Sequence, residues 1–480
     1  MKKNYRLYQW HLFNARGMYF VFVSDKLNLY QVDKDTFKEL EQMKNNQGHQ
    51  NFFEQNGDEL LNELVKEGMV ACIEEEQANN SSKKNQQESI SAEVLGNCEE
   101  PQLTNIVLEL ANDCNLNCKY CYGDGGSYGR ERGLMTYETA IQGIEFFLEK
   151  SGDLKDLLVT FFGGEPLMNF KVLKEITEYC KKRGQETNKT FWFSMTTNGT
   201  ILNEEILNHI KEKNISVMIS MDGPQCVHDN YRCFVNGEGS YQKILPNMKR
   251  LLDIKNGKLS VRSTICKPNM DLSYISNSLL GLGFTTVNLC NVDTDESSDL
   301  FIGKEQIAEL SENYWRLSDD YVEKVKAQKP FGNAVIDSML RDLYFKQTRL
   351  NACNAGVTGI AIDTKGSIYP CHRFMGEKEF LMGDVYSGIT TEISNQFMES
   401  SILTKASCSE CWARLLCKGA CSHTCYKQTG MINKAPECYC ELYKGMFEII
   451  LYIYWELKNW DDDIFRKRLE RVSEAASTIK

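Results

Sequence analysis

The chain has 480 residues, of which 42% are hydrophobic and 25% are charged, and its formal net charge is −11. This length exceeds one ordinary domain, and the negative charge argues against nucleic-acid binding, which needs a basic face. The first residues lack the apolar core of a secretory signal, and the most apolar later run (446–455) is too short to span a membrane. We therefore expect a cytoplasmic protein, with neither a membrane nor a nucleic acid as partner. Its 19 cysteines are too many for chance and, in a reducing compartment, favour metal or cluster ligation over disulfides.

Residues 1–75 are predicted to form a small α+β unit. A hairpin is followed by a helix that Asp33 or Asp35 caps, and a second helix comes after it. Residues 76–100 contain almost no aromatic or branched apolar side chains, which predicts a mobile linker. The β-rich runs are 17–25 and 27–32, and the helical patterns cover 33–43 and 57–70.

Between residues 101 and 325, β-rich runs alternate with helical segments. Such βα units make a parallel sheet, open or partly closed as a barrel, with function at the carboxyl ends of its strands. A connecting segment (326–349) follows. The expected strands lie in 103–110, 156–164, 189–199, 214–223, 257–265 and 284–290, and the clearest helices in 136–150, 170–184 and 203–214.

Three cysteines, Cys114, Cys118 and Cys121, follow the first of these strands in the run "CNLNCKYC". Three thiolates from one loop can hold three corners of a [4Fe–4S] cluster and leave the fourth iron free to bind a small molecule. The alternative is a zinc site with a distant fourth ligand.

Two further motifs also stand at strand ends. "GGEP" (163–166) offers glycines that permit close backbone approach and a glutamate that can accept a hydrogen bond from an amine. "SMDGP" (220–224) offers Ser220 and Asp222 to a ribose or a carboxylate, and Arg232 can pair with a carboxylate bidentately. Each motif alone also fits an ordinary turn or a surface charge.

In combination, these motifs resemble those of the radical S-adenosylmethionine (SAM) enzymes over about residues 101–445. In that family the open iron chelates SAM, whose cleavage gives a 5′-deoxyadenosyl radical that abstracts a substrate hydrogen. The resemblance assigns the cluster to Cys114, Cys118 and Cys121, and SAM contacts to Tyr120, Gly163, Gly164, Glu165, Ser220 and Arg232, with Asn198 and Arg262 as further candidates. Catalytic residues are not identified.

A second cysteine field occupies residues 350–445 and resembles the SPASM extension of the same family, which binds two auxiliary [4Fe–4S] clusters. A zinc ribbon is the alternative for such closely spaced thiols. The resemblance assigns Cys353, Cys371 and Cys421 to auxiliary cluster I, and Cys408, Cys411, Cys417 and Cys440 to auxiliary cluster II. Cys438 is an alternative to Cys440. The fourth position of cluster I is filled by Cys425 or another residue, or is left open for a substrate thiolate.

The fold implied is α/β: a partial (β/α)6 TIM-like barrel between a winged-helix-like amino-terminal domain and a SPASM domain, closed by a helix over 446–480. The front domain resembles the RiPP recognition element, which binds the leader of a ribosomally made precursor peptide, and strand addition would be its physical route. A low-potential flavodoxin or ferredoxin would supply electrons.

The function expected is a peptide maturase of the sactipeptide or ranthipeptide type, which joins a cysteine sulfur to a carbon. Carbon–carbon cross-linking is the nearest rival. A sulfatase-maturating enzyme would carry Asp where this chain has His372, directly after the Gly-x4-Cys cysteine. A non-catalytic, zinc-stapled peptide adaptor is the remaining alternative.

Overall fold

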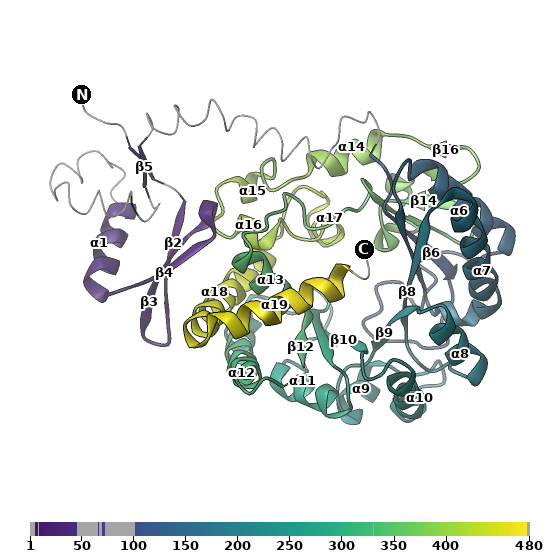
Figure 1. The fold of residues 1–480 in the computed structure, drawn as a ribbon, viewed down its shortest axis with the longest axis horizontal. Helices are drawn as coiled ribbons and strands as arrows, with labels where there is room; N and C mark the ends of the chain where they lie inside the picture. Colours follow the sequence, from purple (N-terminus) through teal and green to yellow (C-terminus); the bar gives the residue numbers. More distant parts are fainter. Residues whose placement is uncertain are drawn as a thin grey trace.

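The computed structural model describes residues 5–7, 9–45, 66, 70–72, 101–329 and 331–477. The predicted helix over 57–70, apart from its residues 66 and 70, and the whole predicted linker (76–100) lie outside these ranges. Figure 1 shows the front domain at one end of the molecule, the large sheet with its helices at the other, and the cysteine-rich segments between them.

In the described residues, the front domain contains an antiparallel sheet in the order β2-β3-β4, which helix α1 follows. Its elements are β2 (Trp10–Ala15), β3 (Met18–Val23), β4 (Asn28–Val32) and α1 (Lys34–Asn45), and a separate pair joins β1 (Tyr5–Leu7) to β5 (Val70–Cys72). Of the two cap candidates, Asp33 is the one used, because its Oδ1 accepts from the main-chain N–H groups of Asp35 and Thr36, both at 2.9 Å.

The predicted parallel sheet is confirmed and is larger than the sequence indicated. Eleven strands pair in the order β12-β11-β10-β9-β8-β7-β6-β13-β14-β15-β16, with every pair from β12 to β13 parallel and the rest antiparallel. The βα strands are β6 (Asn105–Ala111), β7 (Asp156–Gly163), β8 (Thr190–Thr197), β9 (Ser216–Ser220), β10 (Ser260–Ile265) and β11 (Thr286–Asn291). The strands added at the two ends are β12 (Gly332–Asn333), β13 (Gly359–Ile362), β14 (Ser367–Tyr369), β15 (Gly383–Asp384) and β16 (Gly388–Ile389).

Helices cover the outer face of the curved sheet, as α6, α7, α8 and α10 do in Figure 1. Apolar residues that alternate along the strands, such as Ile106, Leu108, Phe161 and Val261, are fully buried beneath them. The helices are α6 (Tyr137–Lys150), α7 (Phe170–Thr187), α8 (Glu204–Glu212), α9 (Gln225–Tyr231), α10 (Tyr241–Ile254), α11 (Leu272–Gly281), α12 (Ile307–Lys326) and α13 (Ala334–Tyr344).

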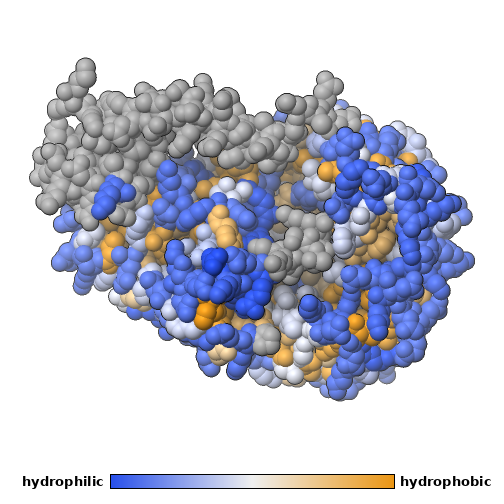
Figure 2. Space-filling view, viewed as in Figure 1, coloured by the Kyte–Doolittle hydropathy of each residue, from blue (hydrophilic) through white to orange (hydrophobic). Residues whose placement is uncertain are grey.

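Short helices and turns carry the second cysteine field, and two longer helices follow. The elements are the 3-10 turn η4 (His372–Phe374), α14 (Glu392–Glu399), α15 (Ala406–Ser409), α16 (Arg414–Cys417), α17 (Ser422–Thr429), α18 (Glu437–Trp460) and α19 (Asp462–Ser477). The single tail helix expected over 446–480 is therefore two helices, and the first begins early enough to include Cys438 and Cys440. On the face seen in Figure 2 the outer side of α19 is mainly hydrophilic, while its Phe465 is fully buried. No helix in the described part of the chain combines the length and the apolar character needed to cross a bilayer.

The front domain is docked on the cysteine-rich region. The His11 ring stacks on Trp412 with centroids 3.7 Å apart and planes 1° apart, and His11 Nε2 lies 2.7 Å from Glu448 Oε1 on α18. Asp25 accepts from Arg414 Nη2 at 2.5 Å. These contacts hold β2 and the turn after β3 against the segment that carries Cys408 and Cys411.

Candidate active site at the carboxyl ends of the strands

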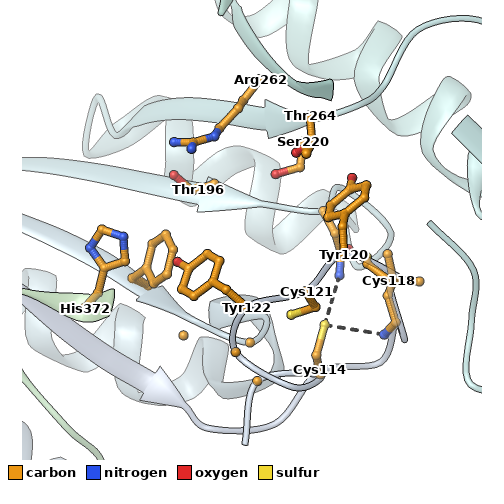
Figure 3. A pocket seen from close by; sticks show the side chains of 18 of the residues that line it. Cys114, Cys118, Tyr120, Cys121, Tyr122, Thr196, Ser220, Arg262, Thr264 and His372 are labelled. Atoms are coloured by element: carbon orange, nitrogen blue, oxygen red, sulfur yellow. Dashed lines mark hydrogen bonds between the residues drawn. The ribbon is translucent and has the colours of Figure 1, made fainter. Parts of the chain in front are cut away.

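The cysteine triad lies in the loop after β6, and Cys114, Cys118 and Cys121 line one cavity of about 170 Å³. Figure 3 shows them grouped at one end of this cavity, with His372 at the other. The Leu116 N–H and the Asn198 side-chain amide point at Cys114 Sγ from 3.4 and 3.8 Å. Burial raises the pKa of Cys114 to about 12 and that of Cys118 to about 11, so these thiols keep their protons until a cation binds them.

The glycines of "GGEP" let the end of β7 lie directly against the start of the cysteine loop. Gly163 has φ +132°, and a Cβ there would stand 2.2 Å from the carbonyl oxygen of Ala111. A Cβ on Gly164 would stand 2.2 Å from the carbonyl oxygen of Asp113. Because no side chain fits at either position, the backbone itself forms this wall of the cavity.

Glu165, for which a SAM contact is expected, is not among the residues that line the cavity. Its carboxylate is fully buried and accepts hydrogen bonds from the Thr197 hydroxyl and the Asn198 N–H, both at 2.7 Å, and from the Leu167 N–H at 3.1 Å. Burial raises its pKa to about 7. Glu165 therefore ties the end of β7 to the turn after β8 and so places Asn198, which does line the cavity.

Tyr120, Asp222 and Arg232 form a buried chain of hydrogen bonds beside the triad. The Tyr120 hydroxyl donates to the Asp222 carboxylate and accepts from Arg232 Nη1 at 2.7 Å. Arg232 is 9% exposed, and its buried Nε has no partner within the described structure, so a ligand can accept from it. Ser220 also lines the cavity, whereas Asp222 does not and instead accepts from the Thr264 N–H at 3.0 Å.

The far wall of the cavity is aromatic and cationic. The His372 ring packs on Phe162 with centroids 4.3 Å apart, and the Arg373 guanidinium lies 4.9 Å from the centre of the Tyr122 ring. Arg262 enters from β10 and extends toward this end of the cavity (Figure 3). Burial, together with Arg373 and Arg262, lowers the pKa of His372 to about 3, so its imidazole is neutral.

Sequence reasoning missed part of this wall. Tyr122, Phe162, Cys290 and Arg373 are not among the residues that the sequence predicts for the site, yet all four line the cavity. So does Asp293, just beyond the end of β11. The signal available for Cys290 and Asp293 was their place at a strand's carboxyl end.

The second cysteine field divides into two groups. Cys353, Cys371 and Cys421 are close enough for their charges to interact, and burial raises the pKa of Cys371 to about 12. Cys440 interacts in the same way with Cys408, Cys411 and Cys417.

The two cysteines that the sequence left open are placed differently. Unlike Cys440, Cys438 points its Sγ at the carbonyl oxygen of Ile302, 3.8 Å away. Cys425 is fully buried and lies between the two groups, with electrostatic interactions to Cys421, Cys408 and Cys440.

Residues 108–271 match the profile of the radical SAM superfamily. This chain carries a radical SAM domain. The matched range contains the cysteine triad, both glycine-containing motifs and Arg232. It ends before the second cysteine field, which the profile does not describe.

Two curated proteins are similar to the radical SAM domain and the region after it. The radical SAM cyclopropyl synthase TigE of Paramaledivibacter caminithermalis is 25% identical over 366 residues, which cover 72% of this chain and 73% of TigE. The cysteine-type anaerobic sulfatase-maturating enzyme of Clostridium novyi is 25% identical over 379 residues, which cover 72% of this chain and 94% of that enzyme.

Solved structures share the fold. Histidine-tagged anSMEcpe with bound AdoMet aligns over 77% of this chain and 98% of its own, with a TM-score of 0.66 and 19% identity. Streptococcus suis SuiB bound to the precursor peptide SuiA aligns over 91% of this chain and 98% of its own, with a TM-score of 0.52 and 13% identity. The radical SAM domain therefore sits in a larger fold that other chains share.

The cavity suits the group that radical SAM domains use, a [4Fe–4S] cluster with SAM. Three thiols from one loop supply the sulfur donors, and the unpartnered Arg232 Nε and Asn291 Oδ1 supply a donor and an acceptor for a polar ligand. As the side chains stand, no three His, Cys, Asp or Glu residues of the described ranges form a site for a metal ion. The fit therefore rests on the donor chemistry and on the glycine-lined wall.

Proposed function

We propose that this chain is a radical SAM enzyme that modifies a precursor peptide and forms a thioether between a cysteine sulfur and a carbon. The observation that carries the proposal is the shared wall of the cavity. His372 and Arg373, which line the far end, directly follow Cys371 of the first auxiliary group. A substrate residue in this cavity would thus lie between the triad and an auxiliary site.

Bound SAM and its cluster would supply a 5′-deoxyadenosyl radical that removes one hydrogen atom from a substrate carbon. Joining that carbon to a thiolate sulfur forms one C–S bond and releases one electron, and the thiol proton goes to solvent. The electron needs an acceptor, and a cluster held by Cys353, Cys371 and Cys421 would supply one beside the far wall, because Cys371 directly precedes His372.

The chain's own residues orient the reaction. Arg232 and Ser220 would bind the carboxylate or ribose of SAM, with Tyr120 holding Arg232 in place. Phe162 and Tyr122 give the far wall apolar surface that excludes water from a radical.

A peptide substrate is supported by the relatives. SuiB is solved with a precursor peptide, and one of the two curated relatives is named a sulfatase-maturating enzyme. The front domain also offers a groove of about 630 Å³ between strand β4, an edge strand of the described sheet, and α18. Asn28–Gln31 line it on one side, and Lys346, Tyr454 and Lys458 line it on the other. A leader peptide could pair with this edge.

The test uses anaerobically reconstituted protein, SAM, dithionite and a candidate precursor peptide that contains cysteine. We expect 5′-deoxyadenosine, loss of two hydrogen atoms from the peptide and loss of one thiol that iodoacetamide can label. Simultaneous replacement of Cys114, Cys118 and Cys121 by Ala should abolish all three of these changes. It should also remove about four irons from a total of about twelve.

Each rival gives another outcome. Two hydrogen atoms lost with the thiol still labelled would mean a carbon–carbon cross-link. Conversion of the peptide's cysteine to formylglycine, with loss of its sulfur, would mean sulfatase-type maturation. A colourless protein with stoichiometric zinc and no deoxyadenosine would leave a peptide-binding adaptor and refute the enzymatic proposal.

A further inference from the structure

Arg373 stands in the wall between the cavity and the first auxiliary cysteine group. It belongs to η4, and its side chain is only 17% exposed. Nη1 lies 3.8 Å from Cys421 Sγ and 2.5 Å from Asp293 Oδ2, while the guanidinium plane covers the Tyr122 ring. One cation thus contacts a candidate cluster ligand and two residues of the cavity.

Asp293 contacts Arg373 and also two residues that follow Cys421 in the chain. Its Oδ2 accepts from Arg373, and His423 Nδ1 and the Thr424 hydroxyl lie 3.2 Å from the same oxygen. His423 and Thr424 stand in the first turn of α17, directly after Cys421. The carboxylate therefore holds Arg373 and the Cys421 segment in one arrangement.

We propose that Arg373 sets the reduction potential of the auxiliary cluster held by Cys353, Cys371 and Cys421, and so makes this cluster the one that takes an electron from the cavity. The inference rests on the proposed function only in taking these cysteines to hold an iron–sulfur cluster. Arg373 is a positioning residue in this role, because it acts through the cluster and not on the substrate.

The physical reason is charge. Reduction by one electron makes the cluster and its thiolates more negative, and a cation at the sulfur stabilises that state. An N–H group directed at a ligand sulfur acts in the same direction. Arginine keeps its proton at any pH that the protein tolerates, so electron uptake needs no coupled proton transfer at this residue. Asp293 offsets part of the positive charge and limits the effect.

The second auxiliary group has a different environment. Cys408, Cys411, Cys417 and Cys440 show no contact with Arg373 among the described interactions. A change at Arg373 should therefore affect one auxiliary cluster and leave the other two clusters unchanged, which a general loss of folding would not do.

The experiment is an EPR-monitored redox titration of the iron–sulfur-loaded protein, without SAM or peptide, for wild type, Arg373→Gln, Arg373→Lys and Asp293→Asn. We expect Arg373→Gln to make one cluster at least tenfold harder to reduce, a shift of 59 mV for one electron. Arg373→Lys should shift it less, since the charge remains. Asp293→Asn should shift it the other way, because it removes the offsetting carboxylate.

Lys427→Gln is the matched control. Its replacement removes the same positive charge from helix α17, which begins directly after Cys421, but Lys427 is 50% exposed and pairs with Glu377. Its variant should leave all three potentials unchanged. The proposal is overturned if Arg373→Gln keeps its full iron content and its potential does not move, if all clusters shift together, or if Asp293→Asn shifts the potential in the same direction as Arg373→Gln. None of these results bears on whether the peptide is modified, so failure here and failure of the proposed function are distinguishable.

Discussion

Replacing Arg130 by Met should destabilise the protein strongly and in a pH-dependent way. Arg130 follows the cysteine loop, and its Nη2 lies 2.6 Å from Glu109 Oε1 on β6, while its Nη1 lies 2.9 Å from Asp363 Oδ2 just after β13. The two carboxylate side chains are 0% and 5% exposed. Removing the cation leaves both of them buried without a counter-charge, which costs about 3 to 5 kcal/mol.

The pH dependence follows from Glu109. Burial raises its pKa to about 7 in the folded protein, although Arg130 lowers it, against an ordinary value of 4.5. A carboxyl group with a raised folded pKa contributes stability that is fully present below 4.5 and is lost as pH rises through 7. In the Arg130→Met variant the Glu109 pKa rises further, so the loss continues above pH 7. The difference between variant and wild type should therefore grow above pH 7, by at most about 1.4 kcal/mol per pH unit.

Urea unfolding under anaerobic conditions at pH 6, 7 and 8.5 measures this difference. Arg466→Met is the control, because Arg466 makes its ion pairs with Asp463 and Glu470 at the surface and should change little. The double variant Glu109→Gln/Arg130→Met should lose the pH dependence. A cost for Arg130→Met that is the same at all three pH values would refute the assignment of Glu109 as the titrating group.

Three further predictions concern other contacts. Cys440→Ala should remove about four irons per chain and Cys438→Ala none, measured by iron analysis, because only Cys440 lies with the second auxiliary group. Tyr120→Phe removes the hydroxyl that accepts a hydrogen bond from Arg232. The affinity for SAM, measured by equilibrium dialysis, should fall about tenfold, or about 1.4 kcal/mol. Trp412→Ala removes the stacking partner of His11 and should speed amide exchange in β2–β4 about tenfold, while exchange in β6–β11 stays unchanged.

The core of the fold was predictable because its signals are local. The residue ranges expected for β6 to β11 contain the observed strands, except that β6 and β11 each end one residue later. The prediction worked because alternation of apolar runs with amphipathic helical segments is typical of parallel βα units. The cavity residues expected at strand ends, from Cys114 to Arg262, come together for the same reason, since parallel strands present their carboxyl ends at one edge. Glu165 is the exception. A carboxylate at a strand end can bind either a ligand in the cavity or a neighbouring turn. The Glu165 carboxylate accepts three hydrogen bonds from its neighbouring turns, and the sequence does not indicate these bonds.

The rest depended on contacts between distant segments. Asp293 and Arg373 are 80 residues apart, and neither lies in a motif that indicates the other. The start of α18 was missed because residues up to 445 were assigned to the cysteine-rich domain, although Pro436 stands directly before the helix. The docking of the front domain rests on single side chains such as Trp412, whose stacking partner the sequence does not indicate.

The pairing of β13 with β6 shows why such contacts matter for function. Strand β13 has four residues, "GIAI", and no pattern that would separate it from a loop. Once it pairs in parallel with β6, its carboxyl end lies at the edge where the cysteine loop begins, and Asp363 meets Arg130 there. The sheet is therefore continuous across the boundary expected at residue 350, and the auxiliary region is built onto the barrel. A separately tethered domain would leave the distance between the two regions free, whereas this shared sheet fixes the far wall of the cavity against the first auxiliary group.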